Sequence, residues 1–204
     1  MVDIYDKAAG KVADHLAKAT GWKKTSDDYQ SMKYGIDALM RNCVSVALLL
    51  IIGYVLGIFS HVALFMLTFG ALRSVSFGAH APNPLVCTIY GIIRTIGGAI
   101  LALSMTNMLP AASLLITLAI DFVAVYCFWR YAPAETKKRP IPPGQRKRFA
   151  RLSKISVIGV IVLRLILLKF SLSAYANTIA IATLAQAINL CPFMFRLFEK
   201  KQIS

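Results

Sequence analysis

The chain has 204 residues, of which 57% are hydrophobic and 16% are charged, with a mean hydropathy of +0.63. A soluble domain averages about a quarter charged residues, so this composition excludes a soluble globular protein. The net charge of +14 sits mainly in one interior loop and at the two ends of the chain, between the apolar runs. That distribution is typical of loops facing an anionic membrane surface, and it argues against a nucleic-acid partner.

The first 38 residues predict an N-terminal region outside the bilayer. Residues 1–40 of the chain include charges of both signs and lack the apolar run of a cleavable signal peptide. Helical spacing over residues 2–16 gathers an apolar face, made of Ile4, Tyr5, Ala8, Val12 and Leu16. We therefore expect an amphipathic helix on the membrane surface, ended by a break within residues 19–28.

Residues 39–204 predict a domain of about six transmembrane helices. A run of about 18 or more apolar residues is long enough to span a bilayer as a helix, and these runs lack the alternation of barrel strands. The run from Asn42 to Leu72 is too long for one crossing, and Gly57 to His61 supplies a break. We expect spans at about 39–58, 61–73, 83–103, 109–130, 155–170 and 174–195. The predicted fold class is an all-α, polytopic integral membrane protein.

The basic residues predict the orientation of these helices. With six crossings, the N-terminal region, the 73–84 loop, the basic and proline-rich 131–154 loop and the C-terminal tail all fall on one side. The turns of the other side, near residues 60, 106 and 172, contain no Lys or Arg, although Lys169 lies close to the last one. The positive-inside rule then places both termini and both loops in the cytoplasm of a multi-pass cell-membrane protein. The 131–154 loop is either a topology signal alone or also attracts an acidic peptide.

The segment 73–87 contains the residues whose side chains are suited to catalysis. Asn83 suits a helix N-cap and Pro84 suits the first helical position, so Cys87 falls in the first turn of a helix. Free N–H groups and the helix dipole favour a thiolate there, and those N–H groups could receive an oxyanion. His80 lies just before the cap, close enough to act as a base, and a Cys with a His is the minimal set for acyl transfer. By spacing alone, a Cys and a His without any catalytic role are the more common interpretation.

This segment resembles the signature of the AgrB family, the membrane peptidases of Gram-positive quorum sensing. The matching residues are Arg73, Gly78, His80 and Cys87. A second match is the run from Tyr131 to Ile141, which resembles the family's Ala-Pro-Ala-Asp-Thr…Pro-Ile loop, with Glu135 where Asp is common. The two motifs, the length and the number of spans make the resemblance cover nearly the whole chain.

The resemblance implies a thiol protease that processes a quorum-sensing peptide. AgrB-type proteins cut the C-terminal tail from an AgrD-type precursor through a Cys acyl-enzyme, which a thiol or hydroxyl of the precursor then attacks to close a thiolactone or lactone ring. Carried over by motif position, Cys87 is the nucleophile and His80 its general base. Gly78 is expected to make a tight backbone turn. Arg73 either clamps a substrate carboxylate or anchors at the lipid headgroups.

Several expectations stay open beside this one. Asp121, Arg94 and Arg164 are ionisable residues inside predicted spans, and we expect Asp121 to pair with one of the arginines or, alternatively, to orient His80. Cys43, Cys127 and Cys191 are expected to be small buried side chains. No metal or cofactor is expected, because no His-Glu-x-x-His or similar ligand spacing is present.

The resemblance to the AgrB family also implies a homodimer, and the sequence itself leaves the oligomeric state open. Gly97 with Gly98, or Gly53 with Gly57, supplies a close approach of helices in a homodimer or within one chain. The alternative function is a non-enzymatic peptide transporter or channel in which Cys87 is merely packed. That alternative predicts export without proteolysis.

Overall fold

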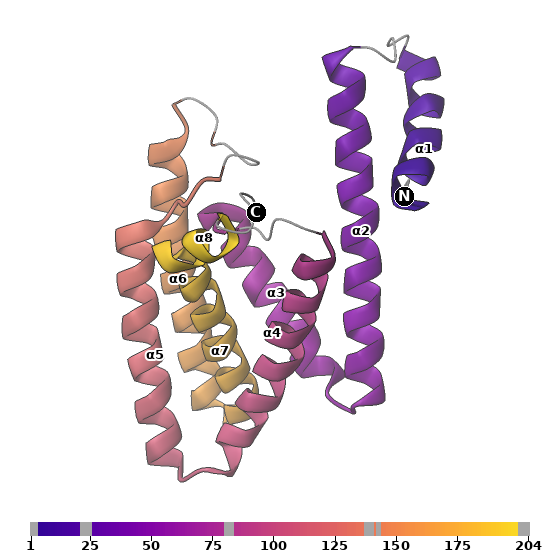
Figure 1. The fold of residues 1–204 in the computed structure, drawn as a ribbon. Helices are drawn as coiled ribbons and strands as arrows, with labels where there is room; N and C mark the ends of the chain where they lie inside the picture. The colour runs from indigo at the N-terminus through magenta and orange to yellow at the C-terminus, as the bar shows by residue number, and fades with distance from the viewer. Residues whose placement is uncertain (1–3, 21–25, 80–83, 137–140, 142–143, 200–204) are drawn as a thin grey trace. The chain divides into compact units, whose positions relative to one another are not determined.

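The computed structural model of the chain describes residues 4–20, 26–79, 84–136, 141 and 144–199. The described part is built from α-helices with short connections (Figure 1), and its only bridge between extended segments is an isolated one. It divides into two compact units, residues 1–51 and residues 52–204, which are taken separately below.

In the first unit, helix α1 (Ile4–Thr20) packs on the beginning of α2 (Asp27–Val55). The contact is made by Ala9, Ala13 and Ala17, which recur every four residues and are buried beside Tyr29. The Tyr29 hydroxyl donates a hydrogen bond to Asp14 Oδ1 at 2.6 Å. Small side chains along one face thus let the two helices approach closely.

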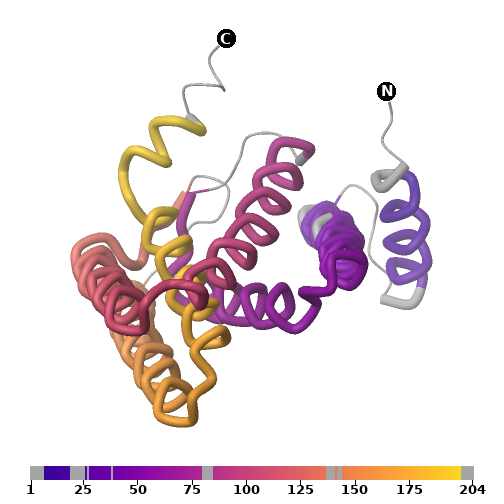
Figure 2. Tube along the Cα trace, turned by 90° about the horizontal axis from the view of Figure 1, so that it is seen from below, coloured from indigo at the N-terminus to yellow at the C-terminus, as the bar shows by residue number. Residues whose placement is uncertain are grey.

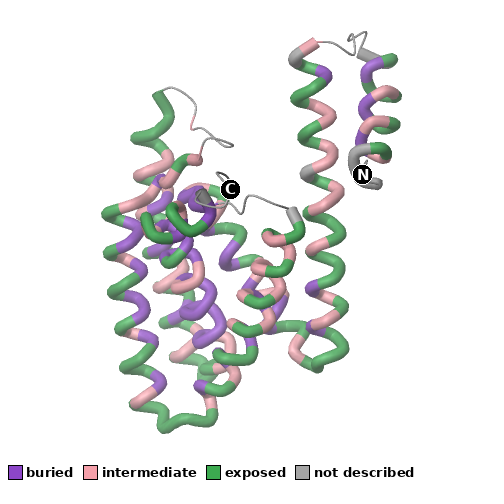
Figure 3. Tube along the Cα trace, viewed as in Figure 1, coloured by how far each residue is buried: buried purple, intermediate pink, exposed green. Residues whose placement is uncertain are grey.

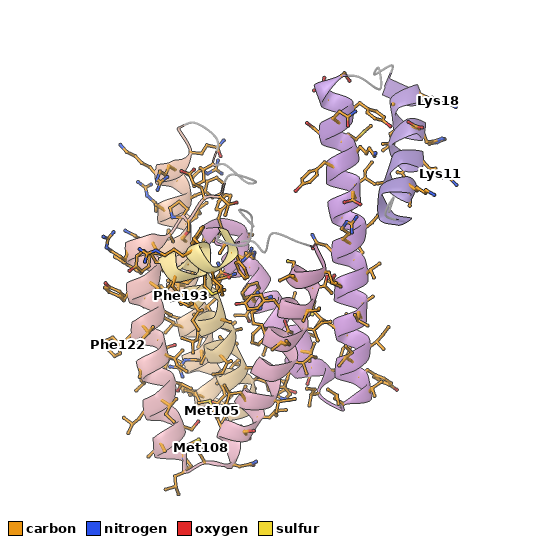
Figure 4. The ribbon with its side chains drawn as sticks, in the orientation of Figure 1. Lys11, Lys18, Met105, Met108, Phe122 and Phe193 are labelled. Atoms are coloured by element: carbon orange, nitrogen blue, oxygen red, sulfur yellow. The ribbon has the colours of Figure 1, made fainter. Side chains whose placement is uncertain are left out.

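The opposite part of α1 keeps its amphipathic character. Val12 and Leu16 are 44% and 42% exposed, and Lys11 and Lys18 point away from α2 (Figure 4). The predicted helix is confirmed, and its location on a membrane surface stays a prediction. So does the domain division into 1–38 and 39–204.

In the second unit, α7 (Ser173–Leu190) is the central helix. It is contacted by α3 (Phe59–Ser76), α4 (Pro84–Ser104), α5 (Pro110–Tyr131) and α6 (Arg146–Lys169), and the views of Figures 1 and 2 agree on this arrangement. Every residue of α7 from Ala176 to Thr183 is buried. A short 3-10 turn, η1 (Met105–Asn107), links α4 to α5, and α8 (Pro192–Glu199) follows α7.

The second unit buries several polar side chains within its hydrophobic core and exposes many large apolar ones, unlike a soluble protein. Figure 3 shows burial concentrated on α7, while the outward faces of its neighbours are exposed. Phe122 of α5 is 77% exposed and points outward (Figure 4), whereas Arg164 of α6 and Gln186 of α7 are fully buried. Such a distribution is stable when lipid rather than water surrounds the helices.

In the described part of the chain, four helices are long and apolar enough to cross a membrane: α2, α3, α4 and α5. The bent pair of α7 and α8 brings the number to five if it counts as one span. An all-α polytopic membrane fold is therefore confirmed, and the count of about six spans stays a prediction. The predicted span 155–170 lies within α6, which carries basic residues along its length, from Arg146 to Lys169.

Two predicted boundaries are confirmed by the backbone. Helix α2 ends at Val55 and α3 begins at Phe59, with Gly57 between them at a φ of +69°. Helix α4 begins at Pro84, as its suitability for a first helical position predicted.

Another predicted boundary is wrong. The span expected at 174–195 is broken, because α7 ends at Leu190 and α8 starts at Pro192, with an angle of 67° between them. Proline cannot donate the N–H bond that would continue α7. Helix α6 starts at Arg146, inside the expected 131–154 loop, because the basic residues there are good helix formers on a solvated surface. The start of the span at about 155 within this helix stays a prediction.

One glycine of each pair singled out for helix approach, Gly98 and Gly53, packs closely within the chain. A Cβ built on Gly98 would overlap the Phe65 ring of α3, and one built on Gly53 would lie 3.0 Å from Val62. Gly97, by contrast, is exposed and has nothing within 4 Å of such an atom. Gly98 therefore brings α3 and α4 together inside one chain.

Candidate functional site

The two motif segments meet at one end of the second unit. The Gly78 N–H donates a hydrogen bond to the Ala134 carbonyl at 2.9 Å, and the Ala134 N–H donates to the Ser76 carbonyl at 3.0 Å. These bonds form the isolated parallel bridge between Phe77 and Ala134. Residues more than fifty positions apart in the sequence are thus joined by backbone bonds, so the two motifs form one structure.

The C-terminal end of α7 forms hydrogen bonds with this junction. Gln186 Nε2 donates to Ser76 Oγ and to the Phe77 carbonyl, both at 2.8 Å. The Ala79 N–H donates to the Asn189 carbonyl at 3.1 Å. Gln186 is fully buried and Asn189 is 1% exposed, so water does not compete for these bonds. The backbone of residues 76–79 is therefore fixed by a second helix.

Gly78 occupies a position where a side chain has no room. Its φ is +121°, which residues with a Cβ rarely adopt, and a Cβ there would lie 3.1 Å from the Asn189 carbonyl oxygen. The backbone therefore makes the tight turn that the sequence predicted at Gly78. The turn is what lets the chain leave α3 and run against the end of α7.

Arg73, in the last turn of α3, braces the same segment. Its Nη2 donates to the Ala79 carbonyl at 2.9 Å, and its guanidinium carbon lies 5.7 Å from the centroid of the Phe69 ring. This bond adds a third interpretation to the two that the sequence left open, namely that Arg73 fixes the carbonyl of the residue before His80.

Cys87 lies in the first turn of α4 with an exposed, free thiol. The next turn of the same face carries Tyr90, which packs against the cluster formed by Ala79, Met194 and Phe198. The Tyr90 and Phe198 rings meet edge to face, with 5.7 Å between their centroids. The α4 face that carries Cys87 is thereby packed against Ala79 and α8.

His80 lies outside the described residues, so its distance from the Cys87 thiol stays a prediction. The structure does describe Ala79, whose N–H and carbonyl are both held, by Asn189 and Arg73 respectively. The chain therefore enters residue 80 from a fixed backbone.

Asp121 forms an ion pair with Arg164 inside the second unit. Arg164 Nη2 donates to Asp121 Oδ2, and Arg164 Nη1 donates to Thr117 Oγ1 at 3.0 Å. Asp121 precedes Tyr131 by ten residues of continuous helix, which corresponds to about 15 Å along the α5 axis. The expected pairing with an arginine is confirmed, and a role in orienting His80 stays a prediction.

The other cysteines differ in burial. Cys127 is buried, Cys191 is partly buried, and their sulfur atoms are 3.8 Å apart. Cys43, which was expected to be buried, is exposed on α2. Cys43 and Cys87 are thus the two exposed thiols of the described chain.

Comparison with known proteins decides the family. The sequence profile described as accessory gene regulator B matches residues 9–190 of this chain. The chain belongs to the AgrB family. Its AgrB-family relatives include the accessory gene regulator protein B of Staphylococcus aureus (strain Newman), which is 27% identical over 95% of this chain and 97% of its own length.

Two further relatives carry the description putative AgrB-like protein. The protein of Listeria monocytogenes serovar 1/2a is 25% identical over 94% of this chain and 90% of its own length. The protein of Clostridium acetobutylicum is 26% identical over 83% of this chain and 78% of its own length. No solved structure matches the chain. Membership of the AgrB family makes this chain a component of agr quorum sensing.

Sequence reasoning about this AgrB-family chain missed the residues that hold the motifs in place. Gln186 and Asn189 of α7 and Ser153 of α6 are buried, and Ser153 Oγ donates to the Val75 carbonyl at 2.9 Å. Polar residues inside an apolar helix are costly unless they have partners, and that signal was available at Gln186 and Asn189. Which backbone groups they bond depends on the tertiary fold, which no local pattern reports.

Proposed function

We propose that this AgrB-family chain is a membrane-embedded cysteine endopeptidase. It removes the C-terminal tail of an AgrD-type precursor and supports closure of the thiolactone or lactone ring of the autoinducing peptide. The observation that carries the proposal is the packing of Tyr90, one turn after Cys87, against the cluster that contains Ala79, the residue before His80. That contact supports a site in which the first motif folds back on itself at the start of α4.

The first step of the proposed reaction is acyl transfer to Cys87. His80 takes the thiol proton, the Cys87 sulfur bonds to the scissile carbonyl carbon, and the tetrahedral oxyanion accepts bonds from free N–H groups of the first turn of α4. The C–N bond then breaks, and the proton passes from His80 to the leaving amine of the tail. The products are the free tail and a thioester on Cys87.

The second step releases the ring. A thiol of the precursor attacks the thioester carbon, the bond to the Cys87 sulfur breaks, and Cys87 recovers a proton through His80. Exchange of one thioester for another is nearly balanced in free energy, so the ring forms if water is kept from the acyl-enzyme. The boundary of a lipid bilayer favours that exclusion.

The proposed setting follows the charge pattern. Both termini, the Cys87 end of the second unit and the basic 131–154 loop are assigned to the cytoplasmic side, where the precursor is made. A homodimer is proposed through lipid-facing small residues, and Gly97 is the exposed one of α4.

The test is cleavage of a cognate precursor by the chain in membrane vesicles, followed by mass spectrometry. Cys87→Ala is expected to abolish release of the tail fragment, because no other described exposed thiol lies on α4. The matched control is Cys43→Ala, which removes the other exposed thiol and is expected to cut at the wild-type rate.

Tail release by Cys87→Ala at the wild-type rate contradicts the proposal. An intact precursor that crosses the membrane in a Cys87-independent manner supports the transporter instead.

A further inference from the structure

Three residues at helical spacing form a stripe on α4. Cys87, Tyr90 and Arg94 follow one another at intervals of three and four residues, so their side chains lie along one face. The lipid-facing positions of α4 are on another face, which carries the exposed Leu85, Ile89 and Ile93. Arg94 therefore belongs to the same face as the thiol, two turns further along the helix.

The guanidinium of Arg94 is held between aromatic rings. Its central carbon lies 3.5 Å from the centroid of the Phe69 ring on α3 and 5.4 Å from that of Tyr90. The guanidinium of Arg73 faces the same Phe69 ring at 5.7 Å. Two cations thus share one ring beside the site, and stacking on that ring offsets part of their mutual repulsion.

Arg94 has no counter-ion among the described residues. No described Asp or Glu forms an ion pair with it, and its Nε is buried without a hydrogen-bond partner in the described part of the chain. Of the other acidic residues of this unit, Asp121 pairs with Arg164 and Glu135 with Arg146, and the side chain of Glu199 lies outside what the structure describes. A partly buried cation with an unused N–H donor is suited to bind an anion.

We propose that Arg94 binds a carboxylate of the peptide substrate and is a specificity-determining residue of the reaction. The proposal rests on the peptidase function proposed above. A guanidinium presents a fork of N–H donors that matches a carboxylate, and seven residues of helix place its backbone about 10 Å from that of Cys87. That distance corresponds to about three residues of extended peptide. The carboxylate it binds therefore belongs to an Asp, a Glu or the chain terminus within a few residues of the cut bond.

A lipid phosphate is the competing source of negative charge. The geometry favours the peptide, because Arg94 shares its face with the Cys87 thiol and is stacked on Phe69 of α3, whereas the lipid-facing side chains of α4 are Leu85, Ile89 and Ile93. The experiment includes an arm for the lipid.

The experiment is a charge-exchange series with the full chain in vesicles. Arg94→Gln is expected to raise the KM for precursor cleavage at least tenfold, while alkylation of Cys87 by iodoacetamide keeps its rate. One acidic residue of the precursor, changed to Gln, is expected to produce the same loss with wild-type enzyme and no further loss with Arg94→Gln. Changing that residue to Lys is expected to restore cleavage by Arg94→Glu. The matched control is Arg130→Gln, which removes an exposed arginine stacked on Tyr131 at 5.7 Å and is expected to leave KM unchanged.

Three results overturn the inference. One is a KM of the Arg94→Gln variant that equals the KM of the wild-type chain. Another is a loss of cleavage by Arg94→Gln that adds to the loss caused by every acidic-to-Gln change in the precursor, with no restored cleavage when the two charges are exchanged. The third is a wild-type rate that is higher in phosphatidylglycerol than in phosphatidylcholine vesicles, with Arg94→Gln abolishing only that difference, which assigns Arg94 to a lipid phosphate. Failure of the peptidase proposal is separate, because it shows as cleavage that does not depend on Cys87.

Discussion

At the scale of single residues, Gly78 is the position where the backbone constrains the site most. Its positive φ and the 3.1 Å approach to the Asn189 carbonyl leave no place for a Cβ. A side chain there costs roughly 1–3 kcal/mol of backbone strain, and the strain is relieved by moving residues 77–79 away from α7. Because Ala79 precedes His80, such a shift displaces the proposed base.

We predict that Gly78→Ala lowers precursor cleavage at least tenfold while the protein still folds. The measurement is the cleavage rate together with the unfolding temperature in detergent. The matched control is Gly159→Ala on α6, where a Cβ meets nothing within 4 Å and the exposed helix gains about 0.5–1 kcal/mol from the better helix former. Unchanged cleavage by Gly78→Ala means that the turn does not position the site.

The residue scale also separates what local patterns predict from what they do not. The Asn83-Pro84 pair predicted the start of α4, and with it the place of Cys87 in the first turn. The bond from Arg73 to the Ala79 carbonyl was not predictable, because the backbone path from α3 to α4 depends on contacts with α7.

At the scale of elements, α7 organises the site through a few buried polar side chains. Gln186 bonds the Ser76 hydroxyl and the Phe77 carbonyl from a helix about 110 residues away in the sequence. The sequence predicted an apolar span here and a break at neither Cys191 nor Pro192. The pairing of α7 with the first motif is tertiary information, so no spacing rule reports it.

We predict that Gln186→Leu destabilises the protein by about 1–3 kcal/mol and reduces cleavage, because it leaves the buried Phe77 carbonyl without that donor. Thr183→Val is the matched control. The Thr183 hydroxyl bonds only the Ile179 carbonyl of its own helix, at 2.8 Å, so its loss is expected to cost less than about 1 kcal/mol. The measurements are the free energy of unfolding in detergent and the cleavage rate of both variants. Equal effects of the two variants argue that α7 contributes packing alone.

At the scale of the whole molecule, the chain buries an ion pair, Arg164 with Asp121, inside its helix bundle. Arg164 is fully buried, and its ion pair with Asp121 joins α5 to α6. The sequence predicted this pairing from the cost of isolated charge in a membrane. It did not predict which arginine takes part, because Arg94 and Arg164 are both single basic residues in apolar runs.

We predict that Asp121→Leu alone destabilises the protein by about 3–5 kcal/mol, because it strands the Arg164 cation, and that adding Arg164→Met restores most of the loss. The measurements are the folded yield and the cleavage rate of the single and double variants. The matched control is Asp37→Asn, which breaks the i,i+4 pair with Arg41 on α2 and is expected to cost about 0.5 kcal/mol or less. A double variant that folds and no longer cleaves assigns Asp121 to the orientation of His80.

The central claim is that Cys87 carries the acyl group, and its most direct measurement is the mass of the intact protein after reaction with a precursor that cannot close its ring. The precursor's internal nucleophile is changed to Ala, so the acyl-enzyme has no intramolecular route of release. The account predicts an adduct equal in mass to the precursor without its tail, less one water, on Cys87, sensitive to hydroxylamine, present in Cys43→Ala and absent in Cys87→Ala. Release of the tail with no adduct, or with an adduct on another residue, contradicts it.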